Sequence, residues 1–311
     1  MDALVNLYKP AGITSRQAVD AVRRALNVKR AGHTGTLDPG AEGVLLICLG
    51  KATRLNEFLQ WLPKTYRATM VLGVQTNTQD AEGTVTATTD ASHVTQQMLE
   101  EVLPRFTGEI EQIPPMHSAL HHEGKRLYDL ARQGQVVARQ PRKVTVHRLY
   151  LQGFSPGEHP EADIEVECST GTYIRTLCAD IGDALGVGGY MKHLVRTAIG
   201  PFRSETAVTL QQLQEGDATE HLIPMSKAVE NLLPVWTPYP RVLRLFRLGR
   251  FVKPKPFPPV PLRNNMPYIA VLDAQGELFA IAVVRRDEVW PYKVFGERIL
   301  YRPREVEEDL G

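Results

Sequence analysis

The sequence predicts an α+β protein in two parts, a large domain over residues 1–235 and a small β-rich module over residues 236–311. Strand-like and helix-like segments alternate without the regular strand–helix–strand order of a doubly wound fold. The length of 311 residues is typical of about two domains. The composition shifts where Pro234, Pro238 and Pro240 cluster, and this shift places the boundary.

The first elements lead into a glycine-rich loop. A short apolar run at residues 3–7 indicates a strand. Apolar residues then recur at helical spacing from residue 18 to residue 26, and Ser15 stands where an N-cap is expected. The glycine-rich loop, residues 32–43, runs directly into an apolar strand at residues 44–49.

Later elements are predicted from the same patterns and from terminal glycines. In the large domain we expect strands at residues 66–74, 144–154 and 164–169, and helices at residues 96–103, 125–133 and 173–185. Gly134 and Gly186 are expected to cap the last two helices. In the module, strands at residues 268–272 and 278–284 flank a turn, and the proline run 254–261 favours extended polyproline II structure.

The composition excludes several classes of protein. With 43% hydrophobic and 23% charged residues the chain is not mainly disordered. No apolar run approaches the roughly 20 residues of a membrane-spanning helix, and the N-terminus resembles no secretory signal, so we expect a cytoplasmic protein. Cys48, Cys168 and Cys178 form no CxxC motif and lie in apolar segments, which predicts buried, inert thiols and no metal site.

The charges are segregated although the formal net charge is only +1. Residues 125–148 hold seven cations and one acid, and residues 241–255 hold six cations and no acid. Such stretches are compatible with a surface that binds a polyanion, and equally with two solvated faces.

The loop at residues 32–43 is the strongest candidate for chemistry. Its four glycines let the backbone turn sharply and approach a ligand closely. It lacks the spacing of a P-loop, which disfavours a phosphate cradle. Two interpretations remain open from the loop alone. Asp38 is either the side chain of a structural turn or a nucleophile or base held at the mouth of a site.

The segment from Gly32 to Pro39, with the following 43–45, resembles the catalytic loop of the TruB-type tRNA pseudouridine-55 synthases. Six blocks that resemble the family's other motifs stand around it in the family's order: residues 9–15, 50–54 with 64–66, 73–83, 113–119, 171–176 and 196–202. The resemblance covers residues 5 to about 235. It implies a catalytic domain with a mixed, largely antiparallel sheet, followed by a PUA-like RNA-binding module.

The resemblance implies that the chain isomerises uridine-55 in the TΨC loop of tRNA after flipping the base out, without a cofactor. Asp38 matches the essential aspartate, which either attacks C1′ or removes the 2′ proton. Tyr66 matches the tyrosine that stacks on the target base, and Arg175 matches the arginine that pairs with the aspartate. The remaining matches are substrate-binding positions: His33, Tyr173, Leu194, Lys9 and Asp80.

Two departures from the family pattern stand near these motifs. Glu42 replaces a small hydroxyl residue and could repel Asp38 or the RNA unless a cation neutralises it, and Asn77 replaces a frequent aspartate. A non-catalytic RNA-binding protein and a guide-dependent relative are the alternatives. Retention of Asp38, Tyr66 and Arg175 argues against the first. The short lead before Lys9 favours a stand-alone, bacterial-type enzyme, expected to be a monomer whose partner is the tRNA T-arm.

Overall fold

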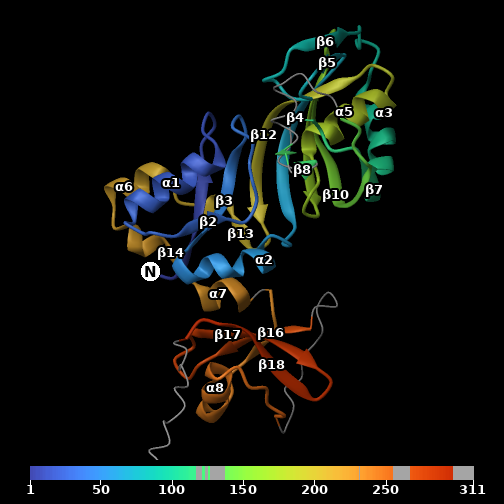
Figure 1. Cartoon of the computed structure of the whole chain (residues 1–311). Coiled ribbons are helices and arrows are strands. Elements are labelled where there is room, and N and C mark those ends of the chain that lie inside the picture. Colours follow the sequence, from blue (N-terminus) through green and yellow to red (C-terminus); the bar gives the residue numbers. More distant parts are fainter. Residues whose placement is uncertain (117–120, 123–124, 127–136, 231, 255–266, 297–311) are drawn as a thin grey trace, which may run out of the picture.

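The computed structural model contains a large sheet and a separate small sheet, with helices packed on both (Figure 1). It describes residues 1–116, 121–122, 125–126, 137–230, 232–254 and 267–296. Within these ranges no helix is long and apolar enough to cross a membrane. The predicted α+β class is confirmed, because nearly all pairs in the large sheet are antiparallel and its helices do not alternate regularly with its strands.

Ten strands form the large sheet. They are β1 (Ala3–Lys9), β2 (Ala31–His33), β3 (Glu42–Leu49), β4 (Lys64–Leu72), β7 (Gly108–Gln112), β10 (Arg142–Ser155), β11 (Glu161–Cys168), β12 (Gly189–Ile199), β13 (Phe202–Arg203) and β14 (Leu222–Pro224). The order is β14-β1-β3-β12-β4-β11-β10-β7, with β2 beside β3 and β13 beside β12. The hairpins β5 (Val74–Thr76) with β6 (Val85–Thr88) and β8 (His121–His122) with β9 (Lys125–Arg126) stand apart from it.

The sheet has two halves that meet at one short join. Strand β3 runs parallel to β12 there, and only two residue pairs are in register, Val195 with Glu42 and Arg196 with Gly43. Gly43 has φ 104°, and a Cβ on it would lie 2.2 Å from the carbonyl oxygen of Arg196. The join therefore requires glycine at this position, because any side chain would push the two halves apart.

The helices bury apolar faces against the sheet. They are α1 (Ser15–Ala25), α2 (Asn56–Leu59), α3 (Gln96–Val102), α5 (Ile174–Ala184), α6 (Leu210–Glu215), α7 (Met225–Glu230) and α8 (Pro240–Arg247), with 3-10 turns η1 (Gly50–Leu55), η2 (Leu103–Phe106), η3 (Ser204–Thr206) and η4 (Ala218–His221). Helices α1 and α6 cover β1 and β3 through one apolar cluster, whereas α3 and α5 cover β4, β10, β11 and β12 through another.

The predicted cap of α1 is wrong by one residue. Thr14 is the N-cap, because its hydroxyl accepts from the backbone N–H of Gln17 while the Gln17 side chain accepts from the backbone N–H of Thr14. The hydroxyl of Ser15 instead exchanges two hydrogen bonds with the backbone of Leu37. At the end of α5, Leu185 is the C-cap, and Gly186 follows it with φ 79°.

Two further predictions need correction. The strand expected at residues 66–74 ends at Leu72, because Gly73 turns the chain with φ 82° where a Cβ would lie 2.4 Å from the carbonyl oxygen of Thr89. The helix expected at residues 125–133 is wrong at its start, because Lys125–Arg126 pairs as a strand with His121–His122. The rest of that helix and its capping Gly134 lie outside the described residues.

The small sheet belongs to the C-terminal module. It consists of β15 (Val235–Trp236), β16 (Tyr268–Leu272), β17 (Leu278–Arg285) and β18 (Glu288–Val294) in that order. The predicted strands in this region are confirmed, as is their turn, where Gly276 has φ 79°. The basic stretch that begins at Arg241 forms most of α8, whose Phe246 is fully buried against the sheet. Most of the proline run 254–261 lies outside the described residues.

Candidate active site at the join of the two half-sheets

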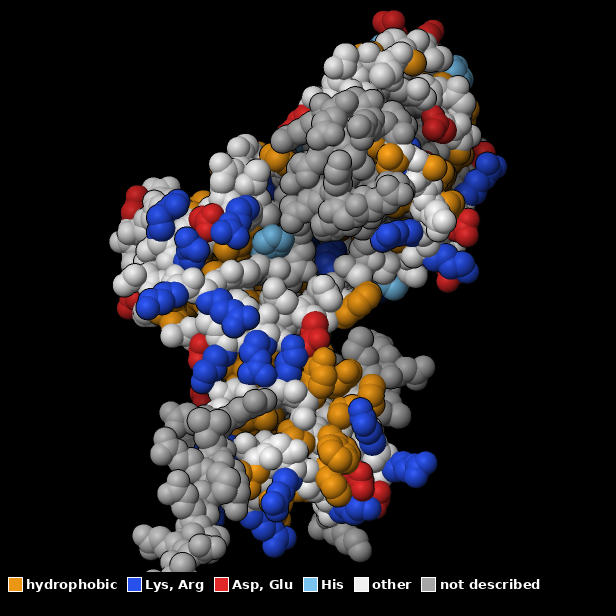
Figure 2. Space-filling model, viewed as in Figure 1, with side chains coloured by type: hydrophobic (Ala, Val, Ile, Leu, Met, Phe, Trp, Pro, Cys, Tyr) orange, Lys and Arg blue, Asp and Glu red, His pale blue; other side chains and the backbone are white. Residues whose placement is uncertain are grey.

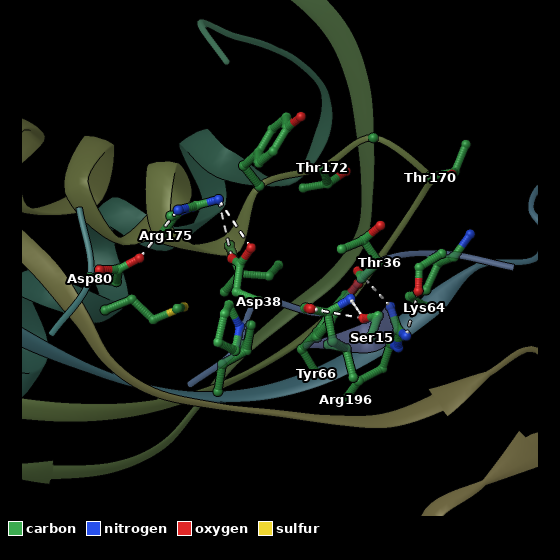
Figure 3. Close-up of a pocket in the computed structure, with 18 of the residues that line it drawn as sticks. Ser15, Thr36, Asp38, Lys64, Tyr66, Asp80, Thr170, Thr172, Arg175 and Arg196 are labelled. Atoms are coloured by element: carbon green, nitrogen blue, oxygen red, sulfur yellow. Dashed lines mark hydrogen bonds and ion pairs between the residues drawn. The ribbon is translucent and has the colours of Figure 1, made fainter. Parts of the chain in front are cut away.

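A cavity of about 680 Å³ lies where the glycine-rich loop meets β4, β12 and the start of α5 (Figure 3). The loop brings Asp38 from one half of the sheet, and the other half supplies Tyr66, Leu194 and Arg175. Segments more than 130 residues apart in the sequence thus meet in one place. The cavity forms only because β3 and β12 are neighbours.

The glycine-rich loop is fixed by buried cations that bind its backbone. Arg196 is 1% exposed, and its guanidinium donates to the carbonyl oxygens of Val44 at 2.7 Å and Gly35 at 3.0 Å. Lys9 is fully buried, and its ammonium donates to the carbonyl oxygens of Pro10 and Ile13 at 2.8 Å and of Pro39 at 3.3 Å. These contacts tether the loop backbone on both sides of Asp38, at Gly35 and at Pro39, so they hold Asp38 in place.

Arg175 pairs with two carboxylates at the mouth of the cavity. Its guanidinium lies 3.2 Å from Asp38 and 3.2 Å from Asp80 (Figure 3). It occupies the second position of α5 and is 6% exposed, where the helix dipole disfavours a cation. The two carboxylates offset that cost. Asp80 is fixed in turn by the hydroxyl of Thr78, which donates to it at 2.5 Å.

Asp38 remains accessible while it is paired. Its side chain is 40% exposed, so a ligand in the cavity can reach the carboxylate. Burial of the surrounding loop raises the pKa of Asp38, the Arg175 guanidinium opposes that rise, and the Asp80 carboxylate adds to it. Because a guanidinium pairs best with an ionised carboxylate, Arg175 favours the charged form of Asp38.

Tyr66, Leu194, Tyr173 and His33 all line the cavity, as the sequence predicts. Tyr66 is 9% exposed, and burial raises the pKa of its phenol, which keeps the hydroxyl protonated. Tyr173 precedes α5, where the Gln112 side chain bonds both its backbone N–H and its carbonyl. Burial lowers the pKa of His33, with Arg196 adding to the effect, so its imidazole is neutral at pH 7.

Lys9 differs from the other predicted positions. It does not line the cavity, and its ammonium is fully engaged with three backbone carbonyls. Burial lowers the pKa of Lys9 to about 8. In this geometry Lys9 supports the loop that carries Asp38 and is not positioned to touch a ligand.

The two departures from the family pattern face away from the cavity. Neither Glu42 nor Asn77 lines it. The carboxylate of Glu42 lies 2.9 Å from Nε2 of His193, and this contact is an ion pair only when the His193 ring is protonated. Asn77 accepts from the backbone N–H of Thr84 at 2.9 Å and closes the β5–β6 hairpin.

Sequence reasoning missed two cations in the cavity wall. Arg196 and Lys64 both line it and are almost fully buried. Lys64 donates to the carbonyl oxygen of Gln60, and burial lowers the pKa of Lys64 to about 8, with Arg196 adding to the effect. A usable signal was present, since each cation stands in an otherwise apolar or β-like segment, where a charge needs a specific partner.

The three cysteines are buried and unpaired, as predicted. Burial raises the pKa of Cys48 and Cys178 to about 12 and that of Cys168 to about 11. Buried thiols with a raised pKa stay protonated, so they do not act as nucleophiles.

Comparison with known families defines the class of the protein. A sequence model of the N-terminal domain of TruB family pseudouridylate synthases matches residues 23–174, and a model of the tRNA pseudouridylate synthase B C-terminal domain matches residues 175–234. The matched span contains Asp38, Tyr66, Asp80 and Arg175. The chain is therefore a pseudouridine synthase, an isomerase. More narrowly, it belongs to the TruB family, which confirms the resemblance that the sequence motifs indicate.

Relatives and solved structures agree with this assignment. A tRNA pseudouridine synthase B of Symbiobacterium thermophilum is 52% identical over 75% of this chain and 77% of its own length. One from Dehalococcoides mccartyi is 40% identical over 95% of this chain and 97% of its own length. The crystal structure of a Cbf5–Nop10–Gar1 complex contains a chain with TM-score 0.71 and 28% identity, covering 95% of this chain and 85% of that one. The small C-terminal sheet is consistent with a PUA-like module.

Proposed function

We propose that this protein converts uridine-55 in the TΨC loop of tRNA to pseudouridine, with Asp38 as the essential carboxylate. The observation that carries the proposal is the Asp38–Arg175–Asp80 arrangement at the mouth of a cavity that also contains Tyr66. One accessible carboxylate, whose charged form is favoured by a neighbouring buried guanidinium, is the group that the proposed reaction requires.

The reaction moves one bond and changes no oxidation state. The C1′–N1 bond of the uridine breaks, the base turns, and a C1′–C5 bond forms, after which C5 loses its proton and N1 gains one. Asp38 either attacks C1′ and is later displaced, or removes the 2′ proton and returns it to C2′ when the C1′–C5 bond forms. Both routes need the carboxylate ionised and within reach of the ribose, and its 40% exposure supports that access.

The target base leaves its stack and enters the cavity. Unstacking costs a few kcal/mol, which contacts in the pocket offset. Tyr66 supplies a ring for stacking at the floor, and Leu194 and Tyr173 supply apolar wall. His33 stands at the rim, where a neutral imidazole can meet the RNA next to the flipped nucleotide.

The rest of the RNA lies across positively charged surface. Lys and Arg side chains gather over α1 and down toward the module on the face shown in Figure 2. On α8, Arg241 and Arg244 are exposed, whereas Arg247 packs over the Phe279 ring at 5.4 Å. We assign RNA binding to the module and propose a domain boundary near residues 235/236, where β15 enters the small sheet. We take the enzyme as a monomer that needs no protein partner.

The test uses purified full-length protein and an unmodified T-arm hairpin RNA. We expect conversion of the single target uridine, measured by chemical mapping of pseudouridine, and no conversion by Asp38→Asn at equal hairpin affinity. Hairpin binding without conversion by the unaltered protein would instead favour a non-catalytic RNA-binding role. Conversion only after addition of a guide RNA and proteins would favour the guide-dependent alternative.

A further inference from the structure

One short segment lies between the C-terminal module and the rim of the cavity. Residues Gly50–Leu55 form η1 and Asn56–Leu59 form α2, directly after β3 (Figure 1). One side of this segment contacts the module, and its other side contacts β2, which carries His33. None of these contacts belongs to the reaction described above.

The module side is held by several polar contacts. Arg54 donates to the carbonyl oxygen of Val294 at 2.8 Å, and Lys51 donates to that of Phe295 at 2.9 Å. In the opposite direction Lys293 donates to the carbonyl oxygen of Arg54 at 2.8 Å and pairs with Glu57. These charge-assisted bonds run both ways, so the module is fixed to the segment in one orientation.

Apolar packing reinforces the same contact. The ring of Phe58 lies edge-on to Tyr268 at 5.3 Å and to Tyr292 at 6.2 Å. Ile281 and Leu272 of the module are buried in one cluster with Leu55 of η1. A displacement of the module therefore moves η1 and α2 with it.

The rim side includes one side-chain hydrogen bond to the backbone of β2. Asn56 donates its amide N–H to the carbonyl oxygen of His33 at 3.3 Å. A Cβ on Gly32 would lie 3.4 Å from that same amide nitrogen, so the helix and the strand are in close contact. Strand β2 has only three residues and pairs with β3 along one edge, through Gly32 with Cys48 and its two neighbours. On its other edge, the amide of Asn56 donates to the backbone of His33.

We propose that Asn56 is a positioning residue that sets His33 at the rim of the cavity, and that it makes this setting dependent on the docking of the C-terminal module. The inference rests on the proposed function, in which His33 meets the RNA. Asn56 touches no reacting atom. Its effect reaches the RNA through the backbone of His33, so it acts on substrate binding and leaves the chemical step unchanged.

The first experiment compares the amide that begins α2 with the amide of the residue that caps its C-terminal end. Asn56→Ala removes the support, and Asn56→Asp replaces the donor by a carboxylate that repels the His33 carbonyl at nearly unchanged size. Gln60→Ala is the matched control, because the exposed Gln60 amide reaches neither β2 nor the module. With the T-arm hairpin we expect KM to rise about three- to tenfold in Asn56→Ala, as for one lost hydrogen bond, and further in Asn56→Asp, with kcat unchanged.

The second experiment tests the two links by double-mutant cycles. If Asn56 acts through His33, Asn56→Ala adds nothing to the KM of His33→Ala. If docking acts through Asn56, Lys293→Met raises KM in the unaltered background and has a smaller effect beside Asn56→Ala. Additive changes in both cycles, or a KM of Asn56→Ala equal to that of Gln60→Ala, would overturn the inference.

Hairpin affinity is measured beside turnover to separate this inference from the proposed function. If the unaltered protein forms no pseudouridine, the proposed function fails, and the order of hairpin affinities among the same variants still decides the role of Asn56. A fall in kcat with no change in KM or affinity would count against Asn56 as a positioning residue.

Discussion

Asp38 has two charged neighbours that act on its pKa in opposite directions, which allows a test by paired substitutions. The Arg175 guanidinium lowers the pKa of Asp38, and the Asp80 carboxylate raises it. The proposed reaction needs Asp38 ionised, so we expect its rate to fall on the acid side as the carboxylate becomes protonated. Arg175→Gln should therefore move this acid limb to higher pH, and Asp80→Asn should move it to lower pH.

The size of the change in the pKa of Asp38 follows from the distance between the Asp38 and Arg175 charges and from the exposure of the Asp38 side chain. Two unit charges 3.2 Å apart interact by about 5 kcal/mol at an effective dielectric constant of roughly 20. The Asp38 side chain is 40% exposed, so water screens the Arg175 pair toward the value of about 1 kcal/mol that exposed pairs show. That energy corresponds to roughly a five- to tenfold change in proton affinity. The effect of Asp80→Asn is smaller, because Asp80 reaches Asp38 only across Arg175.

The assay is single-turnover formation of pseudouridine on the T-arm hairpin between about pH 3 and pH 8, a range that includes the ordinary aspartate pKa of about 4 and values raised above it. Asp183→Asn is the control, because this aspartate lies on the same helix and accepts from Gln75 outside the site. Movement of the limb in the same direction in Arg175→Gln and Asp80→Asn would refute the electrostatic reasoning. If the acid limb of the pH–rate profile stays in place in both variants, Asp38 is not the group whose protonation lowers the rate.

Three further changes test other parts of the molecule. Asp38→Asn should abolish conversion, keep hairpin affinity and leave thermal stability equal or higher, because the fold disfavours the charged carboxylate; residual turnover near the normal rate would refute the assignment. Ile281→Ala should cost about 2–5 kcal/mol and lower the melting of the whole protein, because this fully buried side chain belongs to a core shared with the large sheet; calorimetry that resolves a separate, unshifted catalytic transition would contradict this. Glu42→Gln and His193→Gln should be non-additive in the free energy of unfolding by at most about 1 kcal/mol, and strict additivity would show that the pair does not interact.

The local patterns of the sequence predict most of the elements that carry the site. Apolar runs place β1, β3 and β11, and helical spacing places α1 and α5 to within a residue or two. The motifs identify Asp38 and Arg175, and the structure brings the two within 3.2 Å. These features are local in the chain, which is why a single sequence is enough to find them.

The features that the sequence does not predict depend on distant partners. Strand β12 contains Lys192, His193 and Arg196 among apolar residues. Its ends and faces have different surroundings, so polar and apolar residues do not alternate regularly along it. The buried role of Arg196 follows only from the carbonyls of a loop 160 residues away. Helix α8 begins at Pro240 and contains three arginines, so its sequence resembles a basic loop. Only the structure shows that Phe246 of this helix is buried.

The two-pair join of β3 to β12 also constrains how the enzyme is made. Val195 cannot pair with Glu42 until the chain between them has been synthesised, and at about 5–20 residues per second this takes many seconds. A nascent chain that already contains Asp38 still lacks Arg175 and the strand that closes the cavity, so it has no catalytic power. Closing such a long loop is also a slow step of folding. The ability to modify RNA therefore appears late and all at once, and a chain released early or misfolded at this join has no partial activity.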